Sequence, residues 1–80
     1  MPTISLRYFA ILREQRGLSH EQLSTDAKTP GEIYDALRTK HGFSLPSDRI
    51  RAAVNGNFVD SGSTVKDGDE IVFIPPVAGG

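Results

Sequence analysis

Eighty residues without a cysteine restrict this chain to one domain that has no disulfide framework, no thiolate metal site and no catalytic thiol. Nine Lys and Arg against ten Asp and Glu give a net charge of −1, which lacks the basic excess that nucleic-acid binding requires. No long apolar run occurs, so we expect neither a signal peptide nor a membrane span, and we expect a cytoplasmic protein.

The first third of the chain predicts two strands joined by a short helix. Residues 3–9 alternate between apolar and polar positions, and Phe9 falls on the face opposite the inward set. That inward set consists of Ile4, Leu6 and Tyr8. Residues 10–16 are mostly good helix formers and end at Gly17, a suitable helix C-cap. Residues 20–25 are short and mostly polar, as expected for an edge strand beside the first.

The main helix begins at the strongest local signal in the chain. Thr29 is the predicted N-cap, Pro30 occupies the first helical position, and Glu32, three residues after Thr29, completes a capping box. The apolar stripe that we expect to face the core consists of Ile33, Ala36, Leu37 and the stem of Lys40. Gly42 ends the helix.

The second half of the chain predicts a loop and three strands. Residues 43–49 are interpreted as a loop, and Asn55-Gly56 is typical of a type I′ turn between two short strands. A tight turn at residues 67–70 then leads into a last apolar strand at residues 71–74. One amphipathic helix across one face of a mixed sheet predicts an α+β roll.

Most of the residues that could bind a metal or take part in catalysis lack a second such residue at a suitable spacing. His20 and His41 have no second ligand at metal spacing, so we expect surface histidines and no metal site. The tight turn at residues 67–70, which we call the acidic turn, lacks the remaining positions of a calcium loop. The glycines lack the spacing of a phosphate-binding loop. The remaining nucleophile precursor is the α-carboxylate of Gly80, which is unreactive until another protein activates it.

The last six residues are interpreted as the functional stretch, against the alternative of a frayed end. Two prolines favour an extended departure from the last strand, and two terminal glycines carry no side chain that could obstruct a narrow channel. We therefore divide the chain into a domain at residues 1–74 and a tail at residues 75–80. The tail consists of Pro75, Pro76, Val77, Ala78, Gly79 and Gly80.

Two surface features are expected to meet a partner. Because one helix covers one sheet face while the last strand is apolar at both parities, some apolar side chains must face outward. Our candidates are Phe9, Phe73 and Ile74. Residues 59–80 contain four acids and one lysine, a local charge of −3, which predicts an acidic tail end and a partner with a basic rim.

Several short segments form a combined pattern over the whole chain. They are Tyr8-Phe9-Ala10 with Leu12-Arg13-Glu14, Ala53-Val54-Asn55, Asp67-Gly68-Asp69-Glu70 and Pro75-Pro76-Val77-Ala78-Gly79-Gly80. In order and spacing they resemble the MoaD family of sulfur carriers, the small subunits of molybdopterin synthase within the wider MoaD/ThiS group. The resemblance implies a ubiquitin-like β-grasp fold in which Gly80 carries the sulfur and Gly79 clears the channel. It also implies that Pro75, Pro76, Val77 and Ala78 line the path of the tail.

The resemblance also implies partners but no permanently bound cofactor. An E1-like, MoeB-like adenylyltransferase would adenylate Gly80 with ATP, and a sulfur donor protein would supply the sulfur of a thiocarboxylate. A MoaE-like large subunit, in a heterotetramer, would then use that sulfur to convert cyclic pyranopterin monophosphate into the dithiolene of molybdopterin. The small subunit would contribute no catalytic side chain of its own.

Three alternatives share much of this pattern. A thiamine-pathway, ThiS-like sulfur carrier has the same fold and Gly-Gly end, although the Pro-Pro-Val approach favours the molybdenum pathway. A ubiquitin-like modifier would use the same activated carboxyl group to form an isopeptide bond with a lysine. A non-covalent interaction module would leave the Gly-Gly end without a role.

Overall fold

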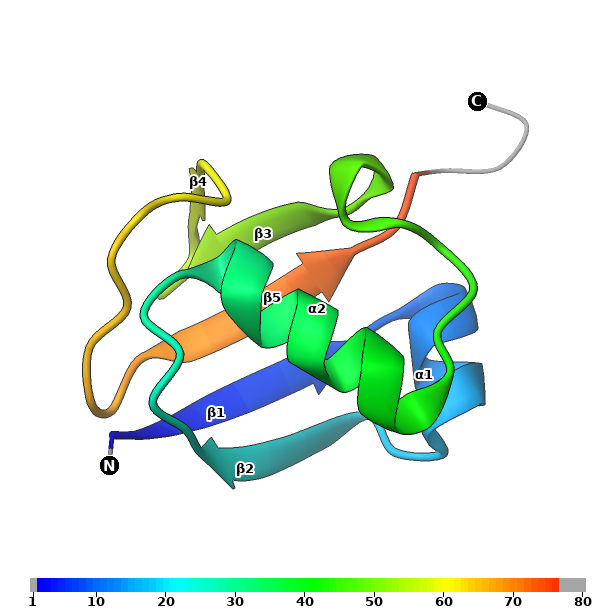
Figure 1. Cartoon of the computed structure of the whole chain (residues 1–80), viewed down its shortest axis with the longest axis horizontal. Coiled ribbons are helices and arrows are strands. Elements are labelled where there is room, and N and C mark those ends of the chain that lie inside the picture. The colour runs from blue at the N-terminus through cyan, green and yellow to red at the C-terminus, as the bar shows by residue number, and fades with distance from the viewer. Residues whose placement is uncertain (1, 77–80) are drawn as a thin grey trace.

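The computed structural model describes residues 2–76 (Figure 1). The predicted tail positions Val77, Ala78, Gly79 and Gly80 therefore lie outside the described residues. The elements in chain order are β1 (Thr3–Tyr8), α1 (Ala10–Arg16), β2 (His20–Ser24), α2 (Pro30–His41), the 3-10 turn η1 (Ser47–Arg49), β3 (Arg51–Val54), β4 (Asn57–Val59) and β5 (Glu70–Ile74).

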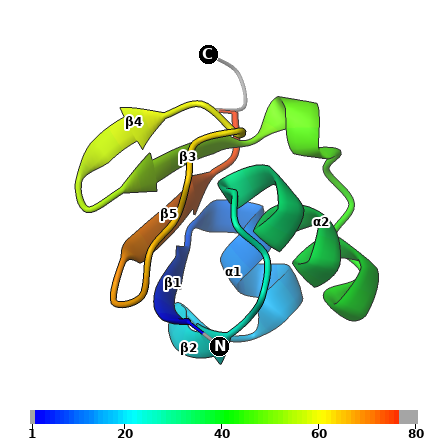
Figure 2. The ribbon, with the colours of Figure 1, turned by 60° about the vertical axis from the view of Figure 1, so that its left-hand side comes forward.

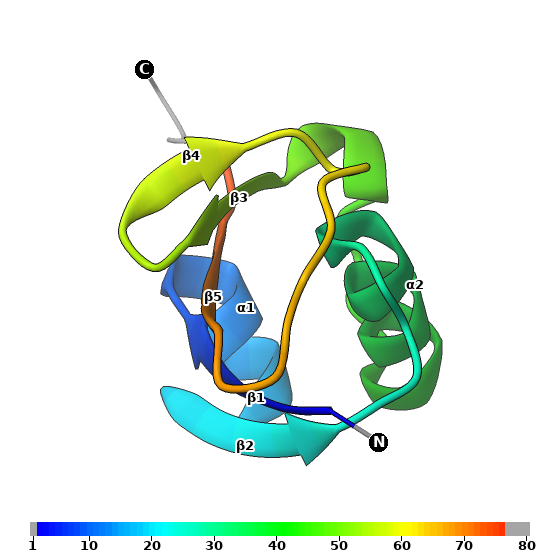
Figure 3. The ribbon, with the colours of Figure 1, turned by 90° about the vertical axis from the view of Figure 1, so that its left-hand side faces the viewer.

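The strands form one mixed sheet in the order β2-β1-β5-β3-β4. β1 and β5 are parallel, while the other neighbouring pairs are antiparallel. α2 packs across one face of this sheet, and α1 lies at the end of β1 (Figures 1 and 2). Figure 3 shows the sheet and α2 as two layers. The predicted α+β roll, with one main helix across a mixed sheet, is confirmed.

The core lies between the sheet and α2. Its members come from both layers, from α1 and from two loops: Ile4, Leu6, Tyr8, Leu12, Ile33, Tyr34, Leu37, Phe43, Ala52, Val65, Ile71 and Phe73. Phe43 lies in the loop after α2, as expected, but it belongs to the core. Its ring stacks on that of Tyr34, with 5.8 Å between the ring centroids. It also meets Tyr8 edge-on at 6.0 Å. These aromatic contacts bind the loop to the core.

The predicted start and end of the main helix are confirmed. The backbone N–H of Glu32 donates to Thr29 Oγ1 at 3.2 Å, Pro30 stands in the first turn, and Gly42 caps the end with φ 72°. The predicted apolar stripe is partly wrong, because Ala36 and Lys40 are exposed while Tyr34 is buried. The rotation of α2 places Pro30, Ile33, Tyr34 and Leu37 against the sheet.

The predicted hairpin is also confirmed. Val54 pairs with Asn57 across the turn, and both central residues are left-handed, with φ 52° at Asn55 and φ 88° at Gly56. This is the geometry of a type I′ turn, which Asn-Gly adopts readily. β4, which follows the turn, ends the sheet at one edge, while β2 ends it at the other. The central position falls to β5, the strand from which the tail departs.

Candidate functional site: the root of the tail

The end of β5 fixes the point at which the chain leaves the folded body. Phe73 is buried in the core, Ile74 is half-buried on the opposite face, Pro75 is buried and Pro76 is exposed. The first proline of the predicted tail is therefore packed against the body. A residue whose φ is fixed near −65° and whose ring is buried gives the departing chain a defined starting direction.

An apolar groove of about 660 Å³ lies beside this departure point. We call it the tail-root groove, and it is lined by Phe9, Ala10, Ile11, Leu45, Arg49, Ile74, Pro75 and Pro76. Its walls come from the start of α1, from the segment around η1 and from the end of β5, which Figure 1 shows meeting at one side of the molecule. Arg49 is the one charged residue among the lining residues.

The turn from β1 into α1 places Phe9 at this groove. Phe9 has an extended backbone, with φ −129° and ψ 155°, and Ala10 follows with φ 52°. A left-handed Ala costs roughly 1–2 kcal/mol, because its Cβ crowds the following carbonyl oxygen. This strained residue redirects the chain at the point where Phe9 stays 46% exposed. Strain of this kind is characteristic of functional positions.

The sheet face opposite α2 carries the expected outward apolar side chains. Val72 and Ile74 are half-buried there, and Phe58 on β4 is 63% exposed. The prediction that some apolar residues must face outward is confirmed. Phe73, however, was a candidate for this surface and is only 1% exposed. Its side chain lies on the sheet face that meets α2, where its ring centre is 5.4 Å from that of Tyr34. Ile74 is therefore the residue of this pair that a partner can reach.

Sequence reasoning missed three of the groove's apolar residues. Ala10 and Ile11 belong to a segment expected to be helical, where nothing marked them as exposed on a groove. Leu45 lies in the predicted loop between two polar or turn-forming residues. The local sequence carries no signal for its position, because its place beside Ile74 results from the path of the chain after α2.

A polar network at the C-terminal end of α1 holds this helix in place. Arg16 Nε and Nη2 donate to the two carboxylate oxygens of Glu21 at 2.7 and 2.9 Å, and Tyr8 Oη donates to Glu21 Oε2 at 2.6 Å. The hydrogen bonds from Arg16 lower the pKa of Glu21. Burial, followed by the hydrogen bond to Glu21, raises the pKa of Tyr8. The network joins α1 to β1 and β2.

The acidic turn lies at the opposite end of β5 from the groove. The Thr3 backbone N–H donates to Asp67 Oδ1 at 2.7 Å, and Asn55 Nδ2 donates to Asp69 Oδ1 at 2.9 Å. A backbone hydrogen bond from Lys66 lowers the pKa of Asp69, and the Asn55 side chain lowers it further.

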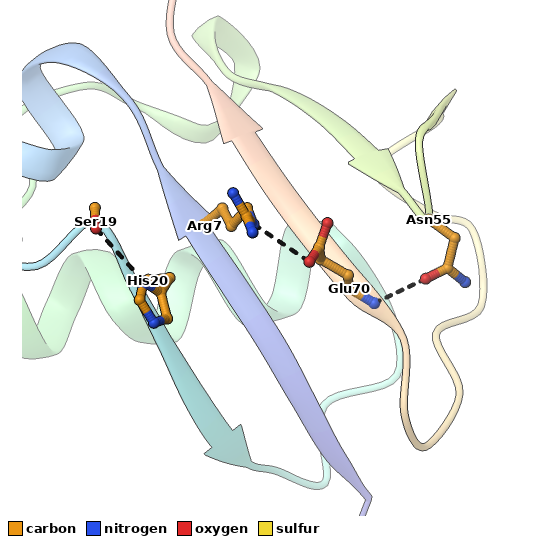
Figure 4. Close-up of polar contacts among 5 residues, drawn as sticks. All are labelled: Arg7, Ser19, His20, Asn55 and Glu70. Carbon is orange, nitrogen blue, oxygen red and sulfur yellow. Dashed lines mark hydrogen bonds and ion pairs between the residues drawn. The ribbon is translucent and has the colours of Figure 1, made fainter.

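Glu70 at the start of β5 is held in a similar way on the outer sheet face. Its backbone N–H donates to Asn55 Oδ1 at 2.9 Å, and its carboxylate lies 3.3 Å from Arg7 Nε (Figure 4). The prediction of an acidic tail end is therefore wrong for three of its four acids, Asp67, Asp69 and Glu70. β5 separates Glu70 and the turn before it from Pro75, so proximity in sequence does not mean proximity in space here.

Other kinds of site receive no support within residues 2–76. His20 is exposed, and its ring nitrogen lies 3.5 Å from Ser19 Oγ (Figure 4). Over the same residues, no group of three His, Asp or Glu side chains is arranged to hold a metal ion. None of the helices in this part of the chain has both the length and the apolar character needed to cross a membrane.

The chain is similar to known proteins over nearly its whole length. It matches the ThiS family over residues 6–80. The molybdopterin synthase sulfur carrier subunit of Haemophilus influenzae is 34% identical over 80 residues, which cover 96% of this chain and 99% of that relative.

Solved structures give the same result for the fold. Small archaeal modifier protein 1 of Haloferax volcanii superposes on this chain with a TM-score of 0.79 at 28% identity. The superposition covers 96% of this chain and 100% of that one. A protein–protein complex of subunits 1 and 2 of the molybdopterin-converting factor from Helicobacter pylori contains a chain that superposes with a TM-score of 0.67 at 26% identity, covering 98% and 99%. The ubiquitin-like β-grasp fold is thereby confirmed.

Proposed function

Because the chain belongs to the ThiS family, we propose that it is a sulfur carrier that works as the small subunit of molybdopterin synthase. The observation that carries the proposal is the geometry of the tail root. The central strand ends at a buried proline beside an exposed apolar groove. A partner that fills the groove would hold the body at a fixed distance from whatever receives the end of the tail.

The proposed chemistry takes place at the carboxyl group of Gly80. In the activating enzyme, a carboxylate oxygen attacks the α-phosphate of ATP and displaces pyrophosphate, which leaves an acyl adenylate. Sulfide-level sulfur from a donor protein then displaces AMP and leaves a thiocarboxylate. ATP is consumed by the activating enzyme and is not a resident cofactor of this chain. Gly79 and Ala78 keep the approach narrow because their side chains are absent or small.

The proposed acceptor is the precursor bound in the large subunit. There the thiocarboxylate sulfur forms a bond to a carbon of cyclic pyranopterin monophosphate and displaces an oxygen substituent from that carbon. Hydrolysis of the resulting thioester bond leaves the sulfur on the pterin and returns the Gly80 carboxylate for another cycle. Two such transfers build the dithiolene of molybdopterin. The large subunit supplies the catalytic side chains, and this chain supplies the sulfur and the docking surface.

Two protein partners follow from this proposal. A MoaE-like large subunit would dock on the tail-root groove and receive the tail, in a heterotetramer with two copies of each chain. The Helicobacter pylori complex of subunits 1 and 2 supports the existence of such a partner. A MoeB-like adenylyltransferase would bind the same surface at a different time. We propose Phe9 and Ile74 as the contacts common to both, with residues 75–80 as the tail.

A second function is favoured by the similarity to small archaeal modifier protein 1. The same activated Gly80 carboxyl group could be transferred to the amine of a lysine instead of to sulfur. Both functions use the same fold and the same first reaction, so the product at the terminus distinguishes them.

Mass spectrometry of the terminus tests the proposal. The protein is incubated with the activating enzyme of its own organism, ATP and a sulfur source, and the C-terminal peptide is then analysed. We expect a mass gain that corresponds to replacement of one oxygen by sulfur, and no such gain without ATP. Protein purified from its own cells distinguishes the alternatives, since isopeptide adducts would favour the modifier. An unmodified acid under both conditions would contradict both functions.

A further inference from the structure

Arg49 is the unexplained feature of the tail-root groove. It lies at the end of η1, it is exposed, and the seven other residues that line the groove are apolar. Asp48 precedes it in the chain but does not line the groove. Within residues 2–76, Arg49 has no carboxylate within 4.0 Å. The groove therefore combines seven apolar residues with one positive charge that forms no ion pair within residues 2–76.

We propose that the tail-root groove accepts an apolar side chain of the large subunit and that an adjacent carboxylate on the same partner pairs with Arg49. This inference rests on the proposed function, since it assigns the chemistry of the partner at that same site. The groove volume falls within the range of about 300–1,000 Å³ that is typical of binding pockets. A guanidinium at the rim of an apolar contact selects a partner that presents an anion in register with its apolar residue.

The distribution of charge over the body supports a pairing of Arg49 with a carboxylate of the partner. At the start of β5, the acids are already engaged by partners within the chain: Asp69 by Asn55 and Lys66, and Glu70 by Arg7. Asp67 accepts from the Thr3 backbone. Glu21, on β2, is engaged by Arg16 and Tyr8. None of these acids lines the groove.

A second arginine lies close to the departure of the tail. Arg51 is the register partner of Ile74 on the neighbouring strand, and its guanidinium carbon lies 4.8 Å from the centre of the Phe58 ring. Asp60 lines the same hollow as Arg51 but forms no ion pair with it within 4.0 Å. The tail end of the body therefore presents two exposed arginines, Arg49 and Arg51, beside the exposed acids Asp48 and Asp60. Of these four, only Arg49 lines the tail-root groove.

The test measures binding of charge-reversed variants to the purified large subunit from the same organism. Arg49→Glu should weaken binding by about tenfold or more at low ionic strength, because attraction becomes repulsion, and Arg49→Gln should weaken it by roughly threefold. The association rate of the native chain should fall as salt rises, and that dependence should flatten in Arg49→Glu. The matched control is Lys28→Glu, an equal change of charge in the connection before α2, which Figure 1 shows on the side away from the end of β5.

The outcomes separate this inference from the function on which it rests. Within the described residues, the arginine side chains that form hydrogen bonds are those of Arg7, Arg16 and Arg38 and not that of Arg49. Variants of Arg49 should therefore keep the native melting temperature. If Arg49→Glu and Lys28→Glu bind alike, with similar salt dependence, the inference is overturned while the sulfur-carrier proposal stands. If the native chain fails to bind the large subunit at all, both are overturned.

Discussion

The two ends of β5 differ in whether their side chains find partners within the chain. At its start, the polar groups of the acidic turn and of Asn55 are engaged by neighbouring strands and by the backbone of Thr3. At its end, apolar side chains surround an open groove with Arg49, which forms no ion pair among the residues that the structure describes. The first end satisfies its own chemistry within the chain. The second leaves apolar area and charge available, which is what a docking surface requires.

This difference explains why stability and function should separate along one strand. Hydrogen bonds at the start of β5 hold the β1, β3 and β5 strands in register. Contacts at its end contribute less to the fold, since Phe9 and Pro76 are exposed there. Substitutions at the start should therefore lower the melting temperature, and substitutions at the end should lower affinity for partners.

The largest expected effect is on binding, at the tail end. Phe9→Asp should weaken binding of the large subunit by about a hundredfold, since a central aromatic anchor contributes 2 kcal/mol or more and a buried carboxylate adds a penalty. The melting temperature should stay near native because Phe9 is 46% exposed. Calorimetric titration measures the affinity, and Leu18→Asp, at an exposed leucine outside the groove, is the control. Native affinity in Phe9→Asp would remove Phe9 from the interface.

The next effect is on stability, at the opposite end. Asn55→Ala removes both side-chain hydrogen bonds to the acidic turn and leaves an alanine at φ 52°. We expect a loss of about 2 kcal/mol in the free energy of unfolding, with unchanged partner affinity. Urea denaturation provides the measurement, and Asn57→Ala serves as the matched control two residues away. Equal stability of the two variants would show that the turn is not held as described.

A smaller effect should appear in the pH dependence of stability. Arg16 lowers the folded-state pKa of Glu21, so the stabilisation is present above the ordinary glutamate value, near 4.3, and disappears as pH falls through the folded pKa. Glu21→Gln should lose roughly 1–2 kcal/mol at neutral pH, and much less in acid. Denaturation at pH 7 and pH 3 measures this. A difference between variant and native protein that is the same at both pH values would contradict the assignment.

The smallest effect tests the strain at the tail end. Ala10→Gly should raise stability by about 0.5–1 kcal/mol, because glycine adopts positive φ without the Cβ clash. The same substitution at Ala36, exposed in the middle of α2, should lower stability by about 1 kcal/mol. Opposite signs for two identical substitutions would locate the strain at Ala10. A loss of stability in Ala10→Gly would contradict it.

The sequence predicted the elements whose signals are local. The capping residues around Thr29, the Asn55-Gly56 turn and the alternation in β1 each depend on neighbours within a few positions. Phe9 was correctly placed on an exposed surface by that alternation. Periodicity was less reliable in α2, where Tyr34 replaced Ala36 in the buried stripe, because the sheet it faces decides which side of an amphipathic helix is covered.

The features that sequence reasoning missed all depend on the path of the chain. Leu45 and Arg49 come to the groove through the loop after α2. The acids were assigned to the tail because they are near it in sequence, but the length of β5 places them at its far end. Phe73 was assigned to the surface because both parities of its strand are apolar, and no local signal indicated which parity would face α2.

The central claim is that the body docks while the carboxyl group of Gly80 carries the chemistry. The most direct test compares the native chain with a variant that lacks Gly80 and a variant that carries one additional residue. We measure binding to the large subunit and the rate of molybdopterin formation for each. Both variants should bind within about threefold of the native chain and should lose on the order of a hundredfold or more in rate, because a displacement of about 1 Å is enough for such a loss. Near-native rates in either variant would contradict the claim.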